Sequence, residues 1–159
     1  MSRLPFLSLP FIVGAWNVAR TPPMGFNTWD LYGCGVTAQI LMDTAISMNA
    51  SGLSKLGFIY VNSDDCWALA ERDANGNQVA NPEKFPDGFK AVADFIHSLG
   101  MKSGLYTAKG PTTCAGFAAS CKHEVQDALQ WASWGIVRAC VVRVPPPRKS
   151  AQLKPPPAL

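Results

Sequence analysis

The stretch "FIYVNSDDCW", residues 58–67, carries the strongest indication of the fold. Its first four residues are apolar, a pattern typical of a strand buried on both faces of a parallel sheet. The strand is followed at once by two neighbouring acids, Asp64 and Asp65. Adjacent carboxylates repel each other and are costly to bury. Because chemistry in α/β folds lies at the carboxyl ends of strands, we expect a functional site where this strand ends.

Strands and helices alternate on both sides of this stretch. Strands are expected at residues 24–29, 58–62 and 101–108, and helices after Thr37, after Asp87 and from Glu124. The helices are recognised by apolar residues at helical spacing, which are Ile40, Leu41, Thr44, Ala45 and Met48, then Phe89, Val92, Ala93, Ile96 and Leu99, then Val125, Ala128, Leu129 and Ala132. This order predicts an α/β fold with a parallel sheet, and it fits both a doubly wound sheet and a (β/α) barrel.

Polar and aromatic residues gather where the predicted strands end. They are Asn27, Trp29 and Asp30, then Asp64, Asp65 and Trp67, then Tyr106 and Lys109. A glycine-rich phosphate-binding sequence follows none of these strands, which disfavours a nucleotide site. The pattern favours a barrel whose mouth binds a polar, uncharged molecule.

The charge of the chain is unevenly distributed. The formal net charge is +3, but five basic residues and no acid lie after Val137. The preceding part holds nine basic and eleven acidic residues, so nothing in it indicates nucleic-acid binding.

The first residues form a separate apolar leader, residues 1–19. Arg3 precedes an apolar run from Leu4 to Val13, which is typical of a secretory signal and too short to span a bilayer. A signal would send the chain to a secreted, vacuolar or lysosomal compartment, where its five cysteines could form disulfides. The alternative is a leader that packs under the domain.

Four longer stretches carry a family resemblance: "RTPPMGFNTWDLYGCG", "GFIYVNSDDCWA", "RDANGNQVANPEKFPDGFKAVADFIHSLGMKSGLYTA" and "CKHEVQDALQWASWG". Together they resemble the melibiase-type α-galactosidases over about residues 20–136. The resemblance implies a (β/α)₈ barrel, of which this chain holds about the first three βα units. It also implies retaining hydrolysis of glycans with terminal α-linked galactose, without a cofactor. N-acetylgalactosamine stays open as the alternative sugar.

The resemblance also implies roles for particular residues. Asp64 and Asp65 would bind sugar hydroxyls, Trp29 would form an apolar wall, and Tyr106 and Cys114 would line the same pocket. The alternatives are a helix cap and a surface ion pair for the two acids, and core packing for the two aromatic residues.

The cysteines carry further expectations. The resemblance implies a disulfide between Cys34 and Cys66, and the alternative is two buried thiols. Cys114, Cys121 and His123 could suggest a metal site, but their spacing is not a standard zinc pattern and a fourth ligand is missing, so we expect no metal.

The family pattern breaks after Ile136. Retaining glycosidases need a nucleophile and an acid/base. The family's Lys-x-Asp-x-Cys pattern falls here on Cys140, Val142 and Val144, so valine stands at the nucleophile position, and valine cannot attack an anomeric carbon.

Residues 137–159 read as a divergent, basic, proline-rich tail that we expect to be disordered, although "IVRACVVRV" (136–144) alternates well enough for a fourth strand. Such a tail could also dock on a partner module. A whole barrel of this type needs about 250 residues. We therefore expect an α-galactosidase by family that is inactive as written, and the alternative is a non-catalytic fragment, inert or weakly galactose-binding.

Overall fold

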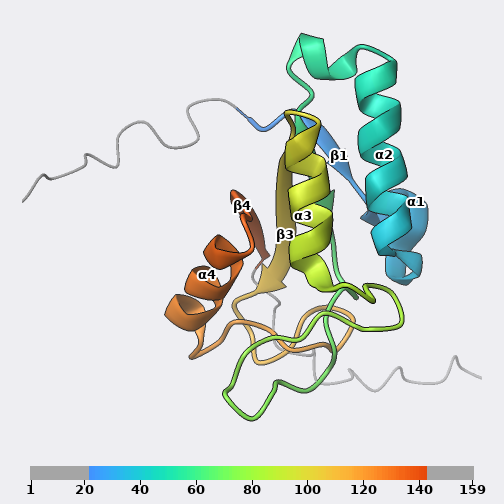
Figure 1. Ribbon diagram of the computed structural model, residues 1–159. Coiled ribbons are helices and arrows are strands. Elements are labelled where there is room, and N and C mark those ends of the chain that lie inside the picture. Colours follow the sequence, from blue (N-terminus) through green and yellow to red (C-terminus); the bar gives the residue numbers. More distant parts are fainter. Residues whose placement is uncertain (1–21, 143–159) are drawn as a thin grey trace, which may run out of the picture.

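The computed structural model describes residues 22–142 (Figure 1). The expected signal and the proline-rich run therefore lie outside the described residues. Four strands form one parallel sheet in chain order, and they are β1 (Gly25–Asn27), β2 (Tyr60–Ser63), β3 (Lys102–Ala108) and β4 (Arg138–Val142). The last of them lies within the segment 136–144, whose alternation is typical of a strand, so residues 138–142 at the start of the expected disordered tail are ordered and pair with β3.

Helices cross between successive strands. They are α1 (Trp29–Tyr32), α2 (Ala38–Ala50), α3 (Gly88–Ser98) and α4 (Glu124–Ser133), with short 3₁₀ helices η2 (Gly33–Gly35) and η3 (Leu53–Leu56). A doubly wound sheet requires the strand order to reverse. Here each new strand is added on the same side, as in a barrel. The fold is thus part of an α/β barrel, as the sequence predicted.

The strand register separates two faces of the sheet. Val61 and Leu105 point into the core beneath the helices. Asn62 and Gly104 are paired in the register and belong to the opposite face, which would be the inside of a barrel. A side chain at position 104 would overlap the Asn62 amide, so this close approach requires glycine.

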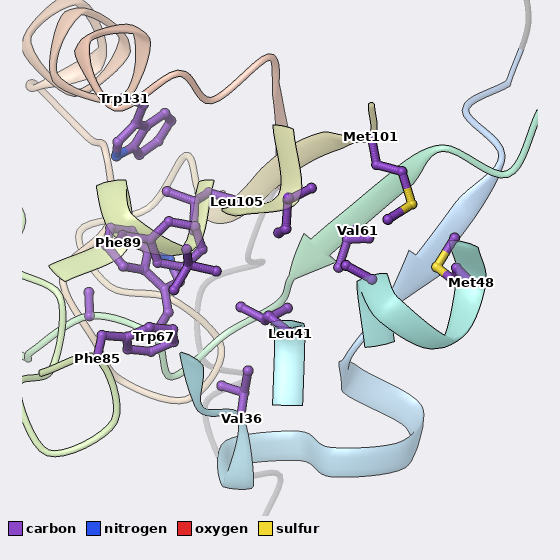
Figure 2. Close-up of a cluster of buried hydrophobic side chains, with 14 residues drawn as sticks. Val36, Leu41, Met48, Val61, Trp67, Phe85, Phe89, Met101, Leu105 and Trp131 are labelled. Atoms are coloured by element: carbon purple, nitrogen blue, oxygen red, sulfur yellow. The ribbon is translucent and has the colours of Figure 1, made fainter. Parts of the chain in front are cut away.

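The hydrophobic core lies between the sheet and α2, α3 and α4 (Figure 2). Phe85 and Phe89 lie 5.2 Å apart between ring centroids, and Trp67 meets Phe89 edge to face at 5.7 Å. The predicted inner face of α3 is confirmed, because Phe89, Val92, Ala93 and Ile96 are buried.

The helix starts follow the sequence with one difference. Thr37 accepts a hydrogen bond from the backbone N–H of Ile40 at 3.3 Å and so caps α2 as predicted. Asp87 stands at the N-cap position of α3, but its side chain makes no capping bond. Within residues 22–142, no helix has both the length and the apolar character needed to cross a bilayer.

The first strand is shorter than predicted. The expected strand at 24–29 ends at Asn27, and Trp29 already begins α1. The side chain of Asn27 accepts a hydrogen bond from the backbone N–H of Trp29 at 2.9 Å. This local turn competes with the strand ladder and ends it.

The apolar face of α4 does not point into the core. Val125 and Leu129 are 74% and 67% exposed, and Ala128 and Ala132 are exposed as well. Asp127 and Trp131 are the buried residues of this helix. An apolar stripe normally faces the core, but in α4 the face that carries Asp127, paired with Arg72, and Trp131 is the buried one, and the apolar stripe lies on the exposed side.

Candidate functional site

Asp64 is held at the carboxyl ends of β1 and β2. Its Oδ2 accepts a hydrogen bond from Nδ2 of Asn27 at 2.8 Å, and its backbone N–H donates to Oγ1 of Thr28 at 3.0 Å. The two partners are the last residue of β1 and the residue that follows it. The half-buried carboxylate of Asp64 is thus fixed in direction while it keeps room to accept further hydrogen bonds.

Asp65 is buried, with 2% of its surface exposed. Its Oδ1 accepts from the backbone N–H of Cys66 at 2.8 Å, and its Oδ2 accepts from that of Ala115 at 2.9 Å. Asp64 also accepts from the backbone N–H of Asp65 at 2.8 Å. Hydrogen bonds to a carboxylate are strong because they are charge-assisted. These donors explain how two adjacent acids are tolerated at the end of a buried strand.

Tyr106 lies on β3 beside this acidic pair and is 4% exposed. Its hydroxyl donates to Sγ of Cys114 at 3.3 Å. Burial, then the contact with Cys114 and the charge of Asp65, raise the pKa of Tyr106 well above its usual value. The hydroxyl therefore remains protonated, and a hydrogen-bond donor, even in alkaline solution where a free tyrosine would ionise.

Trp29 stands at the start of α1 and is 43% exposed. Its backbone N–H and the carboxylate of Asp64 share one partner, the side-chain amide of Asn27. Two hydrogen bonds, both made by the side chain of Asn27, therefore link the start of α1 to Asp64.

The five site residues predicted from the sequence are brought together by one chain of contacts. It runs from Trp29 through Asn27 to Asp64 and Asp65, and on through Ala115 to Cys114 and Tyr106. The contacts join the ends of three consecutive strands. The arrangement offers carboxylate acceptors and a phenol hydroxyl where the strands end, and the exposed residue Trp29 begins the helix that follows the first of these strands.

The disulfide between Cys34 and Cys66 is formed, as the resemblance implied. It joins η2 to the loop after β2, directly next to Asp65. Nζ of Lys84 donates to the backbone carbonyls of both cysteines, at 2.8 Å to Cys34 and 3.0 Å to Cys66. Lys84 therefore stabilises the backbone on both sides of the disulfide.

Several supporting residues were missed in the sequence. Asn27 and Trp67 were noticed only as side chains at strand ends, although Nε1 of Trp67 donates to the carbonyl of Tyr106 at 2.9 Å. The sequence pattern also predicts no role for Thr28 and Lys84. Their partners lie 36 residues away for Thr28 and 50 and 18 residues away for Lys84, and no local spacing signals such contacts.

A buried ion pair holds the two long loops around the site. Nη1 and Nη2 of Arg72 bind the two carboxylate oxygens of Asp127 at 2.7 Å and 2.8 Å. Arg72 also donates to the carbonyl of Ala119 at 2.8 Å, and Gln78 donates to that of Ala118 at the same distance. The loop that carries Cys114 and Ala115 is therefore tied to the loop that follows Asp65.

In the described part of the chain, these residues are not accompanied by a metal-ligating cluster, and the position of the family nucleophile is a valine. Among residues 22–142, no group of three or more His, Cys, Asp or Glu side chains is placed to hold a metal ion. The position that corresponds to the family nucleophile, Val142, ends β4 and pairs with Ala108 of β3. This position lies at the carboxyl ends of the strands, as the two acids do, but valine offers no atom that could attack a sugar.

Comparison with known proteins identifies the family of the chain. Residues 21–141 match the family described as alpha galactosidase A, Melibiase_2. The alpha-galactosidase of Cyamopsis tetragonoloba is 46% identical over 121 residues, which are 76% of this chain and 29% of the relative. Alpha-galactosidase A of Cellvibrio japonicus is 48% identical over 120 residues, 76% of this chain and 30% of the relative.

Solved structures give the same result. Alpha-galactosidase I from Mortierella vinacea superposes with a TM-score of 0.78 at 44% identity, over 80% of this chain and 32% of that one. A Saccharomyces cerevisiae α-galactosidase solved with raffinose gives 0.77 at 36% identity, over 79% and 28%. The chain thus spans about three tenths of the length of the relatives it matches. The chain belongs to the alpha galactosidase A family.

Proposed function

We propose that the described residues are the sugar-binding part of an α-galactosidase barrel, and that the 159-residue chain binds terminal α-galactose without hydrolysing it. The observation that carries this proposal is that Asp64 and Asp65 lie near Tyr106 where β2 and β3 end. In a longer protein with the later strands, the same residues would serve retaining hydrolysis.

The chemistry of the two carboxylates supports a sugar ligand. Sugar hydroxyls donate strong hydrogen bonds to carboxylates. A carboxylate has about four acceptor sites, and each oxygen of Asp64 and Asp65 accepts one backbone or side-chain donor in the structure. The exposed face of Trp29 suits the C–H side of a pyranose ring.

The absence of hydrolysis follows from the residues at the reacting position. A retaining glycosidase holds its two carboxyl groups about 5 Å apart across the scissile bond. Asp64 and Asp65 are adjacent on one loop and already bind backbone N–H groups, so they are sugar acceptors in this proposal. Val142 supplies neither a nucleophile nor a base.

The relatives support the substrate class. The yeast structure named above was solved with raffinose, an oligosaccharide. We extend that class to this chain as a glycan with a terminal α-galactose. The leader, residues 1–19, would direct the chain to a secreted, vacuolar or lysosomal compartment.

The test is a calorimetric titration of the whole chain with methyl α-galactoside. We expect saturable binding with a Kd on the order of 1 mM, equivalent to about 4 kcal/mol. Asp64→Asn should weaken it about tenfold, since one charge-assisted acceptor is lost. Asp94→Asn, an exposed acid on α3, is the matched control and should leave binding unchanged.

A chromogenic α-galactoside tests the second half of the proposal. We expect turnover no faster than that of a heat-denatured sample. Equal binding by wild type and Asp64→Asn would remove the site assignment, and turnover abolished by Asp64→Asn would show that the chain is an enzyme.

A further inference from the structure

Exposed apolar side chains gather at the two ends of the sheet. Besides Trp29, Met24, Leu31, Tyr32, Ile46, Leu53 and Leu56 surround β1 and α2. Val125, Leu129, Val137 and Val141 lie on α4 and β4 at the other end. Within the described residues, α3, β2 and β3 contribute no exposed large apolar side chain. Figure 1 shows these two ends on opposite sides of the molecule, with α3 and β3 between them.

Each end also carries a groove. A groove of about 720 Å³ lies between α4 and β4 and is lined by Ala128, Trp131, Ile136, Ala139 and Val141. A groove of about 440 Å³ lies beside β1, against Phe26, Leu31, Ile40, Met48 and Leu53. Contiguous apolar surface of this kind usually marks an interface.

The backbone at both ends is open as well. In the described part of the chain, β1 pairs only with β2, and β4 pairs only with β3. A free strand edge presents unpaired N–H and C=O groups and tends to pair with another strand. The two free edges are opposite edges of one parallel sheet, so a strand added to β4 in parallel could be another β1.

We propose that a second copy of this chain occupies both ends, with β4 of each copy pairing in parallel with β1 of the other. Four strands are half of an eight-stranded barrel, so two such junctions related by a two-fold axis close the sheet. Closure removes every free edge.

The charges of the two grooves favour this occupant. Lys109 and Arg138 line the groove at β4 together with one acid, Glu124. The groove at β1 is lined by a single charged residue, Asp43. The ends therefore carry opposite net charge, as a head-to-tail contact between copies requires.

The proline-containing outer segments of the same chain, residues 1–10 and 145–157, are poor alternatives. Residues 145–147 and 155–157 are prolines, and Pro5 and Pro10 interrupt the leader. Proline has no backbone N–H and cannot complete a strand ladder. The described strands β1 and β4 contain no proline.

The first measurement is sedimentation equilibrium of the thiol-blocked, 159-residue chain. We expect twice the 17.1 kDa of one chain at tens of micromolar, and dissociation on dilution. A monomer throughout, or an open series of larger species, would overturn the proposal. Sugar binding by a monomer would leave the proposed function intact, so the two failures are distinguishable.

Hydrogen exchange then locates the contact. Peptides from β1 and β4 should exchange more slowly in the dimer than in the diluted monomer, while α3 should not change. Protection confined to any other element would contradict edge pairing, even if a dimer forms.

Variants provide an independent check. Val141→Lys places a charge on the exposed side of β4 and should shift the dimer toward monomer at least tenfold, because lysine on an edge opposes pairing. Ala139→Lys, also exposed on β4, is the second variant in case the first fails to fold. Ala91→Lys, exposed on α3, is the control and should leave the dimer intact. Folded β4 variants that still form the full amount of dimer would refute the proposal.

Discussion

Asn27 donates its side-chain amide to Oδ2 of Asp64 at 2.8 Å, and this bond joins the ends of β1 and β2. The same side chain accepts from the backbone N–H of Trp29. One amide thus ends the first strand, begins α1 and directs the first of the two adjacent acids.

Replacing Asn27 tests this linkage. Asn27→Ala removes both bonds, and we expect galactose affinity to fall about tenfold, because a hydrogen bond to a charged group contributes about 1.5 kcal/mol. Isothermal calorimetry measures the change. Gln39→Ala, which removes an exposed bond to Asp43 on α2, is the control and should not alter affinity. Unchanged affinity in Asn27→Ala would show that the amide does not direct Asp64.

The ion pair of Arg72 with Asp127 should dominate the stability of the loops. Asp127 is fully buried, so Asp127→Ala leaves a buried guanidinium without its partner and should cost about 3–5 kcal/mol. Urea unfolding followed by circular dichroism measures the loss.

A matched ion pair provides the comparison for this loss. Lys90 and Asp94 lie 2.7 Å apart but are both 57% exposed, so Lys90→Ala should cost less than about 1 kcal/mol. Similar costs for the two variants would contradict the structural role of the buried pair.

The orientation of α4 predicts that substitutions at two nearby positions will differ greatly in their cost to stability. Trp131 packs into the core, and Trp131→Ala should lower the free energy of unfolding by about 3–5 kcal/mol. Leu129→Ala removes a mostly exposed side chain and should change it by less than about 0.5 kcal/mol. The free energy of unfolding of both variants is measured at a protein concentration low enough for the chain to be monomeric. The reverse order of costs would contradict this orientation of α4.

Tyr106 should make stability depend on alkaline pH. Its pKa is raised in the folded state by burial, so the folded chain keeps this proton while the unfolded chain loses it above about pH 10. The stabilisation is complete below the unfolded pKa and is lost as the pH rises toward the folded value. Urea midpoints across this range should fall more steeply in wild type than in Tyr106→Phe, and equal slopes would contradict a raised pKa.

The elements that the sequence predicted correctly depend on local patterns. The apolar run before Asp64 gives β2, helical spacing gives α3, and Thr37 caps α2. The site residues came from the resemblance, and the contacts among them connect strand ends far apart in the chain.

The errors share one physical cause, which is a specific polar contact that overrides a local pattern. Asn27 ends β1 through its own side chain, although the following residues continue the apolar and aromatic pattern. Arg72 turns Asp127 inward across 55 residues of sequence and leaves Leu129 exposed. Hydrophobic periodicity carries no information about either contact.

The central claim is that a sugar binds between the acidic pair and the indole of Trp29. The most direct test is a titration of the ¹⁵N-labelled chain with methyl α-galactoside, followed by the indole N–H signal of Trp29, which is assigned by its loss in Trp29→Phe. We predict that this signal and the backbone signals of Asp64 and Asp65 shift together with one saturation curve, while the indole signal of Trp131 stays in place. Signals of Trp29 and both acids that remain fixed at saturating sugar would contradict the account.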